Sequence, residues 1–174
     1  MKKMIDEIEE HSSREFGLKV SESLPPLNDW IGKIRAIGAE EYLPKSGLRS
    51  VILFLDDDRL QLVRVTSEMN DYDERGEAGR LCFDRCKSVE IDRESLVFYK
   101  EIPRPISVKK LKFICGDFST ESGLAFSFED LDDVVIVAAA FPYYISVIGV
   151  SEEYSSAAEF PLSEYNTEYL NLSN

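Results

Sequence analysis

The sequence predicts an α+β fold: a largely antiparallel β-sheet of about six to eight strands, with one or two N-terminal helices packed on it. Two patterns lead to this prediction. Apolar residues between positions 27 and 37 recur at steps of three and four, which is typical of one face of a helix. From residue 48 onward, short apolar runs are separated by polar links, as strands are by turns. The 174 residues, 44% apolar and 11% aromatic, suffice for a single domain with its own core.

The predicted helices lie in the N-terminal part. Residues 1–24 are expected to form a short helix or an arm, and Pro25-Pro26 separates them from a helix within 25–43. The apolar stripe of this helix consists of Leu27, Trp30, Ile31, Ile34 and Ile37. Asn28 or Asp29 can cap it, because a short side-chain oxygen reaches the backbone N–H groups of the first turn. Trp30 is therefore expected in the core.

The β-rich part covers residues 48–150. Runs 51–55 and 60–65 flank the acidic link Asp56-Asp57-Asp58 and predict a hairpin. Further strands are expected at 95–100, 108–115, 124–128, 134–140 and 144–150, and the run 134–140, apolar without alternation, suits a central strand. A second acidic turn at 129–133 joins two of these strands. Residues 67–80 are polar and contain glycine, which predicts the longest loop, and residues 151–174 form an acidic tail, expected as a loop or a loosely packed extension.

Negative charge is concentrated in the last third of the chain. All 20 Lys and Arg residues lie within the first 112 positions, and the net charge is −13. Such a field repels nucleic acid and anionic membranes and attracts a basic partner. The small basic cluster Lys109, Lys110 and Lys112 is too weak to reverse this, and we expect it to shield an edge strand or to pair with the acidic third.

No catalytic, metal-binding or cofactor-binding constellation is apparent. The single histidine, His11, has no nucleophile or metal-ligand pattern around it, and Cys82, Cys86 and Cys115 are read as reduced, partly buried thiols. We therefore expect a protein that is not an enzyme, with no cofactor and no metal. Asp56-Asp57-Asp58 lacks the alternate spacing and the glycine of a calcium loop. A solvated turn is the simpler interpretation.

The cellular location is expected to be the cytoplasm. No run approaches the roughly 20 apolar residues of a membrane helix. The first residues include two lysines but carry acid where the apolar stretch of a signal peptide would lie. Reduced thiols agree with this location.

A small, strongly acidic, single-domain chain with these properties resembles the immunity proteins of bacterial polymorphic-toxin and contact-dependent inhibition systems. The strand–acidic turn–strand segment 123–143 is also similar to segments of such proteins. The resemblance implies a tight complex with a cognate toxin domain, often a basic nuclease, that is blocked sterically and electrostatically. Since the family shares no functional motif, no site residue follows from it.

The residues themselves suggest where such a partner would bind. Carboxylates in the two acidic turns and in the 71–77 segment can meet Lys and Arg of the partner, and nearby tyrosines can supply apolar contact area. The predicted partner-binding residues are Asp56, Asp57, Asp58, Asp71, Asp73, Glu74, Glu77, Glu129, Asp130, Asp132, Asp133, Tyr143 and Tyr144. Two alternatives stay open: a small-molecule-binding or regulatory α+β domain, with an apolar pocket, and a hydrolase with two carboxylates facing each other in a cleft.

Overall fold

The computed structural model describes residues 14–73 and 76–173, and it corrects the predicted fold class: the protein is mostly β, 53% strand and 10% helical. Its strands are β1 (Glu15–Phe16), β2 (Lys19–Val20), β3 (Ile34–Leu43), β4 (Gly47–Leu55), β5 (Leu62–Asp73), β6 (Gly76–Cys86), β7 (Phe98–Glu101), β8 (Ser107–Cys115), β9 (Phe118–Ser127), β10 (Val134–Ala138), β11 (Ile145–Ile148) and β12 (Asn166–Tyr169). The described helical residues are 3-10 turns: η1 (Leu27–Asp29), η2 (Ile31–Lys33), η3 (Ser88–Glu90), η4 (Arg93–Ser95) and η5 (Leu162–Glu164).

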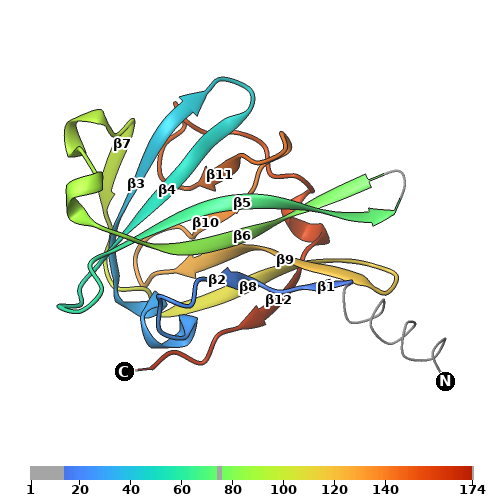
Figure 1. Cartoon of the computed structure of the whole chain (residues 1–174), viewed down its shortest axis with the longest axis horizontal. Coiled ribbons are helices and arrows are strands. Elements are labelled where there is room, and N and C mark those ends of the chain that lie inside the picture. Colours follow the sequence, from blue (N-terminus) through green and yellow to red (C-terminus); the bar gives the residue numbers. More distant parts are fainter. Residues whose placement is uncertain (1–13, 74–75, 174) are drawn as a thin grey trace.

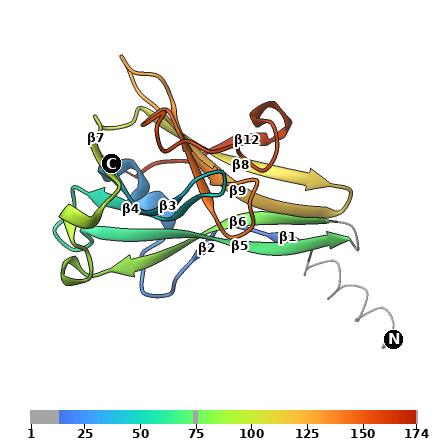
Figure 2. The same cartoon turned by 90° about the horizontal axis from the view of Figure 1, so that it is seen from above.

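All twelve strands belong to one sheet that curls into a half-barrel (Figures 1 and 2). Its main path runs β12-β8-β9-β10-β11-β4-β5-β6-β2, while β3 joins β4 to β7. Neighbours pair antiparallel except in two places, where β1 pairs parallel with β9 and β2 with β6. The curl brings β6 against β9 and β10 across the interior. The sheet is thus mixed and larger than predicted, and within residues 14–73 and 76–173 no α-helix covers it.

The predicted helix within 25–43 is wrong. Residues 27–33 form η1 and η2, and Ile34 starts β3, which lies between β4 and β7. A spacing of three suits 3-10 turns as well as an α-helix, and both faces of β3 are buried near its start, so its apolar residues do not alternate. Trp30 is in the core as expected, 1% exposed, with its indole N–H donating to the carbonyl of Pro25 at 2.9 Å. Of the short helix or arm predicted over residues 1–24, the first 13 residues, with His11, lie outside the described residues, and the described remainder contains β1 and β2.

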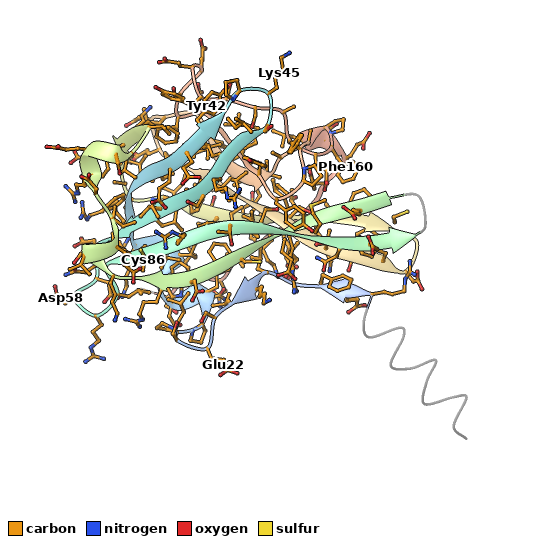
Figure 3. All side chains as sticks on the ribbon, turned by 45° about the horizontal axis from the view of Figure 1, so that its top comes forward. Glu22, Tyr42, Lys45, Asp58, Cys86 and Phe160 are labelled. Carbon is orange, nitrogen blue, oxygen red and sulfur yellow. The ribbon has the colours of Figure 1, made fainter. Side chains whose placement is uncertain are left out.

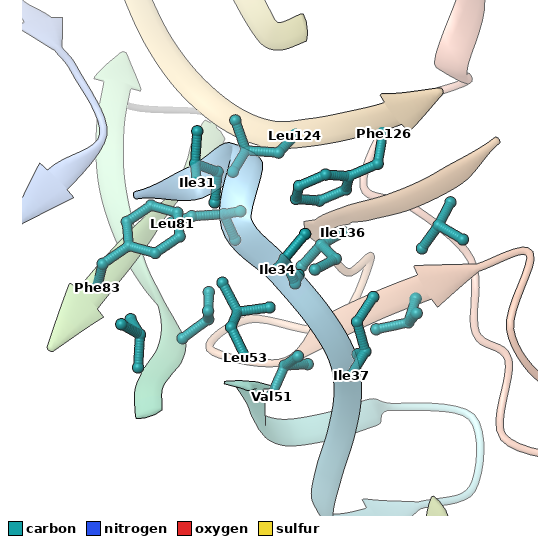
Figure 4. Packing of buried hydrophobic residues seen from close by; sticks show 14 of the residues in the cluster. Ile31, Ile34, Ile37, Val51, Leu53, Leu81, Phe83, Leu124, Phe126 and Ile136 are labelled. Carbon is teal, nitrogen blue, oxygen red and sulfur yellow. The ribbon is translucent and has the colours of Figure 1, made fainter. Parts of the chain in front are cut away.

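The main core fills the concave side of the sheet. Figure 4 shows Ile34 and Ile37 of β3 packed among Leu53, Leu81 and Phe126, which come from three other strands. A second cluster, centred on Ile52, Phe54 and Leu62, lies on the outer face beneath the segment 88–99. The cores on both faces explain why so many of the strands read as continuous apolar runs.

Several predicted strands and hairpins are confirmed. The β4–β5 hairpin and the β9–β10 hairpin have the two acidic links as their turns, and β10 is a buried central strand between β9 and β11. Residues 67–73 and 76–80, in contrast, are not a loop, because they belong to β5 and β6, which pair antiparallel over this length. Polar pairs such as Glu68 opposite Arg80 take the place of apolar alternation there.

The acidic tail is packed, not loose. Tyr165 is 6% exposed, β12 pairs antiparallel with β8, and Leu172 lies against Gly32. The β8 strand is therefore not an edge. Its Lys110 pairs with Glu121 and Glu168, as expected if the basic cluster meets the acidic third.

The N-terminal strands bridge the two ends of the curl. Glu121 of β9 accepts a hydrogen bond from the backbone N–H of Leu18 at 3.1 Å, and Arg80 of β6 donates to the carbonyl of Gly17 at 3.3 Å. The guanidinium of Arg80 also lies 5.6 Å from the ring centre of Phe16. Residues 15–20 thus connect β9 with β6 through both strand pairing and side chains.

Candidate functional site

An open groove of about 740 Å³ lies on the outer face of β3, β4 and β5. The loop 141–144, between β10 and β11, forms one rim, and the end of β3 forms the other. The residues that line it are Glu40, Glu41, Arg49, Ser50, Arg64, Thr66, Ser67, Phe141, Pro142, Tyr143 and Tyr144. We call it the aromatic groove.

The floor of the aromatic groove is a polar network. One carboxylate oxygen of Glu40 accepts hydrogen bonds from the Ser50 hydroxyl at 2.8 Å and from the Arg64 Nε at 3.1 Å. Burial opposes the charge of Arg64, but the hydrogen bond and attraction of Glu40 outweigh it and hold the pKa of Arg64 above its ordinary value. The floor is therefore charged but internally paired, and it is fixed in place by three strands.

The aromatic rim is exposed and held in a fixed shape. Phe141 and Tyr143 are 51% and 61% exposed, and Tyr144 packs edge-on against Phe141 with ring centres 5.4 Å apart. Tyr143 has a φ of +69°, and Glu41 on the opposite rim has a φ of +52°. A left-handed backbone is unfavourable for residues with side chains and is found preferentially at functional sites. Tyr143 and Tyr144, both predicted contact residues, thus lie together at one groove.

A second hollow of about 470 Å³ continues the aromatic groove along β5, since Thr66 and Ser67 line both. At its far end the Glu68 carboxylate binds Arg80 at 2.7 Å and Lys19 at 3.2 Å, and these two cations lower the pKa of Glu68, Arg80 more than Lys19. Burial, reinforced by Glu68, raises the pKa of the Cys82 thiol to about 11. The extended trough therefore presents paired charges of both signs.

The acidic turn at 56–58 is less negative than its sequence implies. The Asp57 carboxylate accepts from the backbone N–H groups of Arg59 and Leu60, at 2.8 and 3.3 Å, and lies 3.0 Å from the Lys33 ammonium. The Arg59 N–H, followed by Lys33, lowers the pKa of Asp57. Asp57 thus shapes the turn, while Asp56 and Asp58 are exposed beside a cleft that also contains arginines.

The acidic turn at 129–133 has the opposite character. Its four carboxylates are exposed, and none forms an ion pair with another described residue: Glu129, Asp130, Asp132 and Asp133. Leu131 at its centre is 53% exposed. This turn is therefore a source of unbalanced negative potential.

The β5–β6 hairpin brings three more carboxylates into one region. Asp71 lies directly opposite Glu77 in the register, an unfavourable placement for two like charges. Glu159 approaches from the C-terminal segment, where burial, supported by the charge of Glu77, raises its pKa to about 7. Asp73 is the last residue of β5, and Glu74 lies outside the described residues.

The predicted contact residues do not form one continuous surface. The turn at 129–133 and the tyrosines 143–144 lie at opposite ends of β10, whose five residues span about 17 Å. Three carboxylates of the last third are paired internally: Asp117 with Arg14, and Glu121 and Glu168 with Lys110. The sequence interpretation also missed Phe141, Glu40 and Arg64. The run Phe141-Pro142-Tyr143-Tyr144 was a usable signal, but the groove floor joins three strands and has no local pattern.

Comparisons with protein-family models, with curated proteins and with solved structures found no match to this chain. Within the described residues, no group of three or more His, Cys, Asp or Glu side chains is arranged to hold a metal ion. The described 3-10 turns are all short, and the part of the chain that the structure describes contains no helix that could cross a membrane.

Proposed function

We propose that this protein binds a cognate toxin domain through the aromatic groove and neutralises it by covering its functional surface, as an immunity protein does. The observation that carries the proposal is the exposed aromatic loop 141–144 beside an open groove with a rigid floor. Phe141 packs against Tyr144, and aromatic side chains, which have only two rotatable bonds, lose little entropy on binding. Such residues dominate the binding energy of protein interfaces.

The charge distribution supports a basic partner. The net charge of −13 gives long-range attraction, and the turn 129–133 adds a local cluster of unpaired carboxylates. Because this turn lies at the other end of β10 from the aromatic loop, it is suited to guiding approach and to contacts at the periphery. Attraction of this kind raises association rates more than it slows dissociation.

Neutralisation then needs no chemistry by this chain. The aromatic side chains enter a complementary surface of the toxin, and the paired Glu40 and Arg64 satisfy polar groups beneath them. Carboxylates at the edge bind toxin lysines and arginines that would otherwise face its substrate. The toxin is inhibited because its substrate can no longer reach it.

The central test uses growth rescue by this protein. If the reading frame directly upstream encodes a large secreted protein with a C-terminal toxin domain, that domain is expressed with either the natural protein or the Phe141→Ala/Tyr143→Ala variant. We expect the natural protein to restore growth and the variant to fail, with binding weakened about 100-fold or more because two central aromatic contacts are lost. Tyr169→Ala is the matched control, since Tyr169 is equally exposed, at 69%, but lies on β12.

The test has clear contrary outcomes. Rescue and affinity unchanged in the double variant would show that the aromatic groove is not the binding surface. An equal loss in Tyr169→Ala would show a general effect of removing exposed rings. Failure of the natural protein to rescue growth or to bind that toxin domain would overturn the immunity function itself.

A second experiment distinguishes long-range electrostatic attraction by the turn 129–133 from direct contact with the toxin. Neutralising Glu129, Asp130, Asp132 and Asp133 to Gln or Asn is expected to slow association several-fold, with dissociation nearly unchanged, and high salt should remove the difference. The control neutralises four exposed carboxylates that lie elsewhere: Glu22, Glu94, Glu101 and Glu164. Equal slowing in both variants would contradict a local role for the turn.

A further inference from the structure

A separate cleft of about 310 Å³ lies at the β4–β5 turn, beneath the segment 88–93. It shares no lining residue with the aromatic groove, and the outer cluster around Ile52 lies between β4–β5 and the covering segment. Figure 3 shows Asp58 at this end of the molecule, near Cys86, whereas Tyr42 and Lys45 mark the β3–β4 turn at another side.

One wall of the cleft is cationic. The guanidinium carbons of Arg35 and Arg93 lie 5.9 and 5.3 Å from the ring centre of Phe54, and Arg93 also lies 5.1 Å from the ring centre of Tyr99. Arg35 donates a hydrogen bond to the Tyr99 hydroxyl at 3.3 Å. Stacking holds a guanidinium by its face and leaves N–H groups on its edge available. Neither arginine has an ion-pair partner within the described part of the chain.

Another wall is anionic. Asp56 and Asp58 line the same cleft, are exposed, and have no ion-pair partner among residues 14–73 and 76–173, whereas Asp57 is engaged with Lys33 and the turn. Opposite charges therefore line one small cleft without forming ion pairs with each other. The side chains of Leu62 and Ile91 add an apolar surface to it.

We propose that this cleft binds a small zwitterion, namely a free α-amino acid with an apolar side chain. Its carboxylate would accept hydrogen bonds from Arg35 and Arg93, the geometry that guanidinium groups favour. Its ammonium would lie against Asp56 and Asp58, and its side chain against the apolar surface. The volume is at the lower end of the range of small-molecule sites. A simple anion or a simple cation would leave one wall unsatisfied and would meet charge of its own sign.

This site does not depend on the proposed toxin binding. It gives specific content to the alternative interpretation of the sequence as a small-molecule-binding domain. The two sites can coexist, because they occupy different parts of the outer face.

The experiment is a calorimetric titration of the full chain with L-leucine, L-isoleucine and L-phenylalanine. The matched probes are 4-methylpentanoate and 3-methylbutylamine, which are leucine without its ammonium and without its carboxylate. We expect at least one amino acid to bind, and each single-charge probe to bind about tenfold more weakly or not at all, because a charge-assisted contact is missing. Backbone amide shifts of Phe54 and Ile91 should move on titration, which locates the site without any substitution.

Variants test each wall. Arg93→Gln and Asp58→Asn should each weaken amino-acid binding about tenfold, while Lys45→Gln and Glu153→Gln, which remove a charge of the same sign from exposed side chains elsewhere, should leave it unchanged. Unchanged fluorescence of the buried Trp30 confirms that a variant is folded. The proposal is overturned if none of the three amino acids binds at millimolar concentration. It is also overturned if 4-methylpentanoate binds as well as leucine, or if the shifted amides lie away from the cleft.

Discussion

The side-chain carboxylate of Glu159 accepts a hydrogen bond from the backbone N–H of Gly79 at 2.8 Å, across 80 positions of the sequence. The same segment is tied to the sheet by the Glu159 N–H, which donates to the carbonyl of Ala138, and by a bridge between Ala139 and Ala158. The C-terminal segment therefore joins β6 to the end of β10 where the sheet curls upon itself. Any change in the charge of Glu159 acts on this junction.

The stability of the protein is expected to depend on pH through Glu159. Burial raises its pKa from 4.5 to about 7 in the folded state. The contribution of Glu159 to the free energy of unfolding is therefore fully present below about pH 4.5, where the carboxyl group is protonated in both states. It is lost as the pH rises through 7, because the buried group must then ionise. Glu159→Gln keeps the acceptor for Gly79 but cannot ionise. We expect it to match the natural protein near pH 4.5 and to be more stable by about 1–2 kcal/mol at pH 8, after allowing for partial exposure. Urea unfolding at several pH values measures this.

Glu153→Gln is the control for the pH series, because Glu153 is exposed and its removal changes net charge equally. It should follow the natural protein within about 0.5 kcal/mol at every pH. A difference between the Glu159→Gln variant and the natural protein that stays constant from pH 4.5 to 8 would contradict burial of the Glu159 carboxylate.

Gly79 is required by the close approach of β6 to β10. A side-chain carbon at position 79 would lie 2.6 Å from the Cβ of Ala138, so Gly79→Ala must push the two strands apart. We expect a loss of about 1–3 kcal/mol in the free energy of unfolding. Ala138→Gly in the same molecule removes the clashing atom and should restore part of the loss. If the double variant is as unstable as the sum of the two single variants, the clash is not the cause.

The pair formed by Lys110 and Glu121 is expected to matter for stability, in contrast to most surface pairs. The two side chains are 22% and 13% exposed and lie 2.6 Å apart. Glu121→Ala leaves the half-buried Lys110 ammonium without its main partner and removes the acceptor of the Leu18 N–H. We expect it to lower the free energy of unfolding by about 3 kcal/mol. Glu168→Ala removes the exposed partner of the same lysine, at 3.7 Å, and should cost about 0.5 kcal/mol or less. Equal losses in denaturant unfolding would refute this ranking.

The three cysteines should differ in reactivity. Cys115 is exposed, Cys86 is buried, and burial raises the pKa of Cys82 to about 11. Because the thiolate is the reactive form, iodoacetamide at pH 7.5 should modify Cys115 first, with Cys82 and Cys86 reacting only after unfolding. Mass spectrometry of peptides over time measures the order. Early modification of Cys82 in folded protein would contradict its partial burial and its raised pKa.

The strands β7 to β11 could be predicted approximately because their signals are local, whereas β12 in the acidic tail was not predicted. Val134–Ala138 is apolar without alternation and is covered on both faces, and the acidic residues on its N-terminal side form a turn as expected. The strand β3 could not be distinguished in this way. Ile34 and Ile37 satisfy a helical spacing, and the partners that make them a strand, β4 and β7, follow later in the chain.

The candidate site was predictable only in part. Tyr143 follows Pro142 in a short break between two strands, which made its exposure a reasonable prediction. The pairing of Glu40 with Arg64 depends on the order of strands in the sheet, which no local pattern specifies. The ion pair between Asp57 and Lys33 likewise has no local pattern, because the two residues come from separate segments of the chain.

The connection that residues 15–20 make between β6 and β9 has a consequence for the order in which the chain folds. Leu18 binds Glu121, which is 103 positions further on, and Lys19 of β2 pairs with Cys82 of β6, so residues 15–20 cannot complete their contacts until β9 has been synthesised. Pairings between such distant residues make folding slow. During translation, residues 15–20 therefore remain without their strand partners until β6 and β9 have been synthesised.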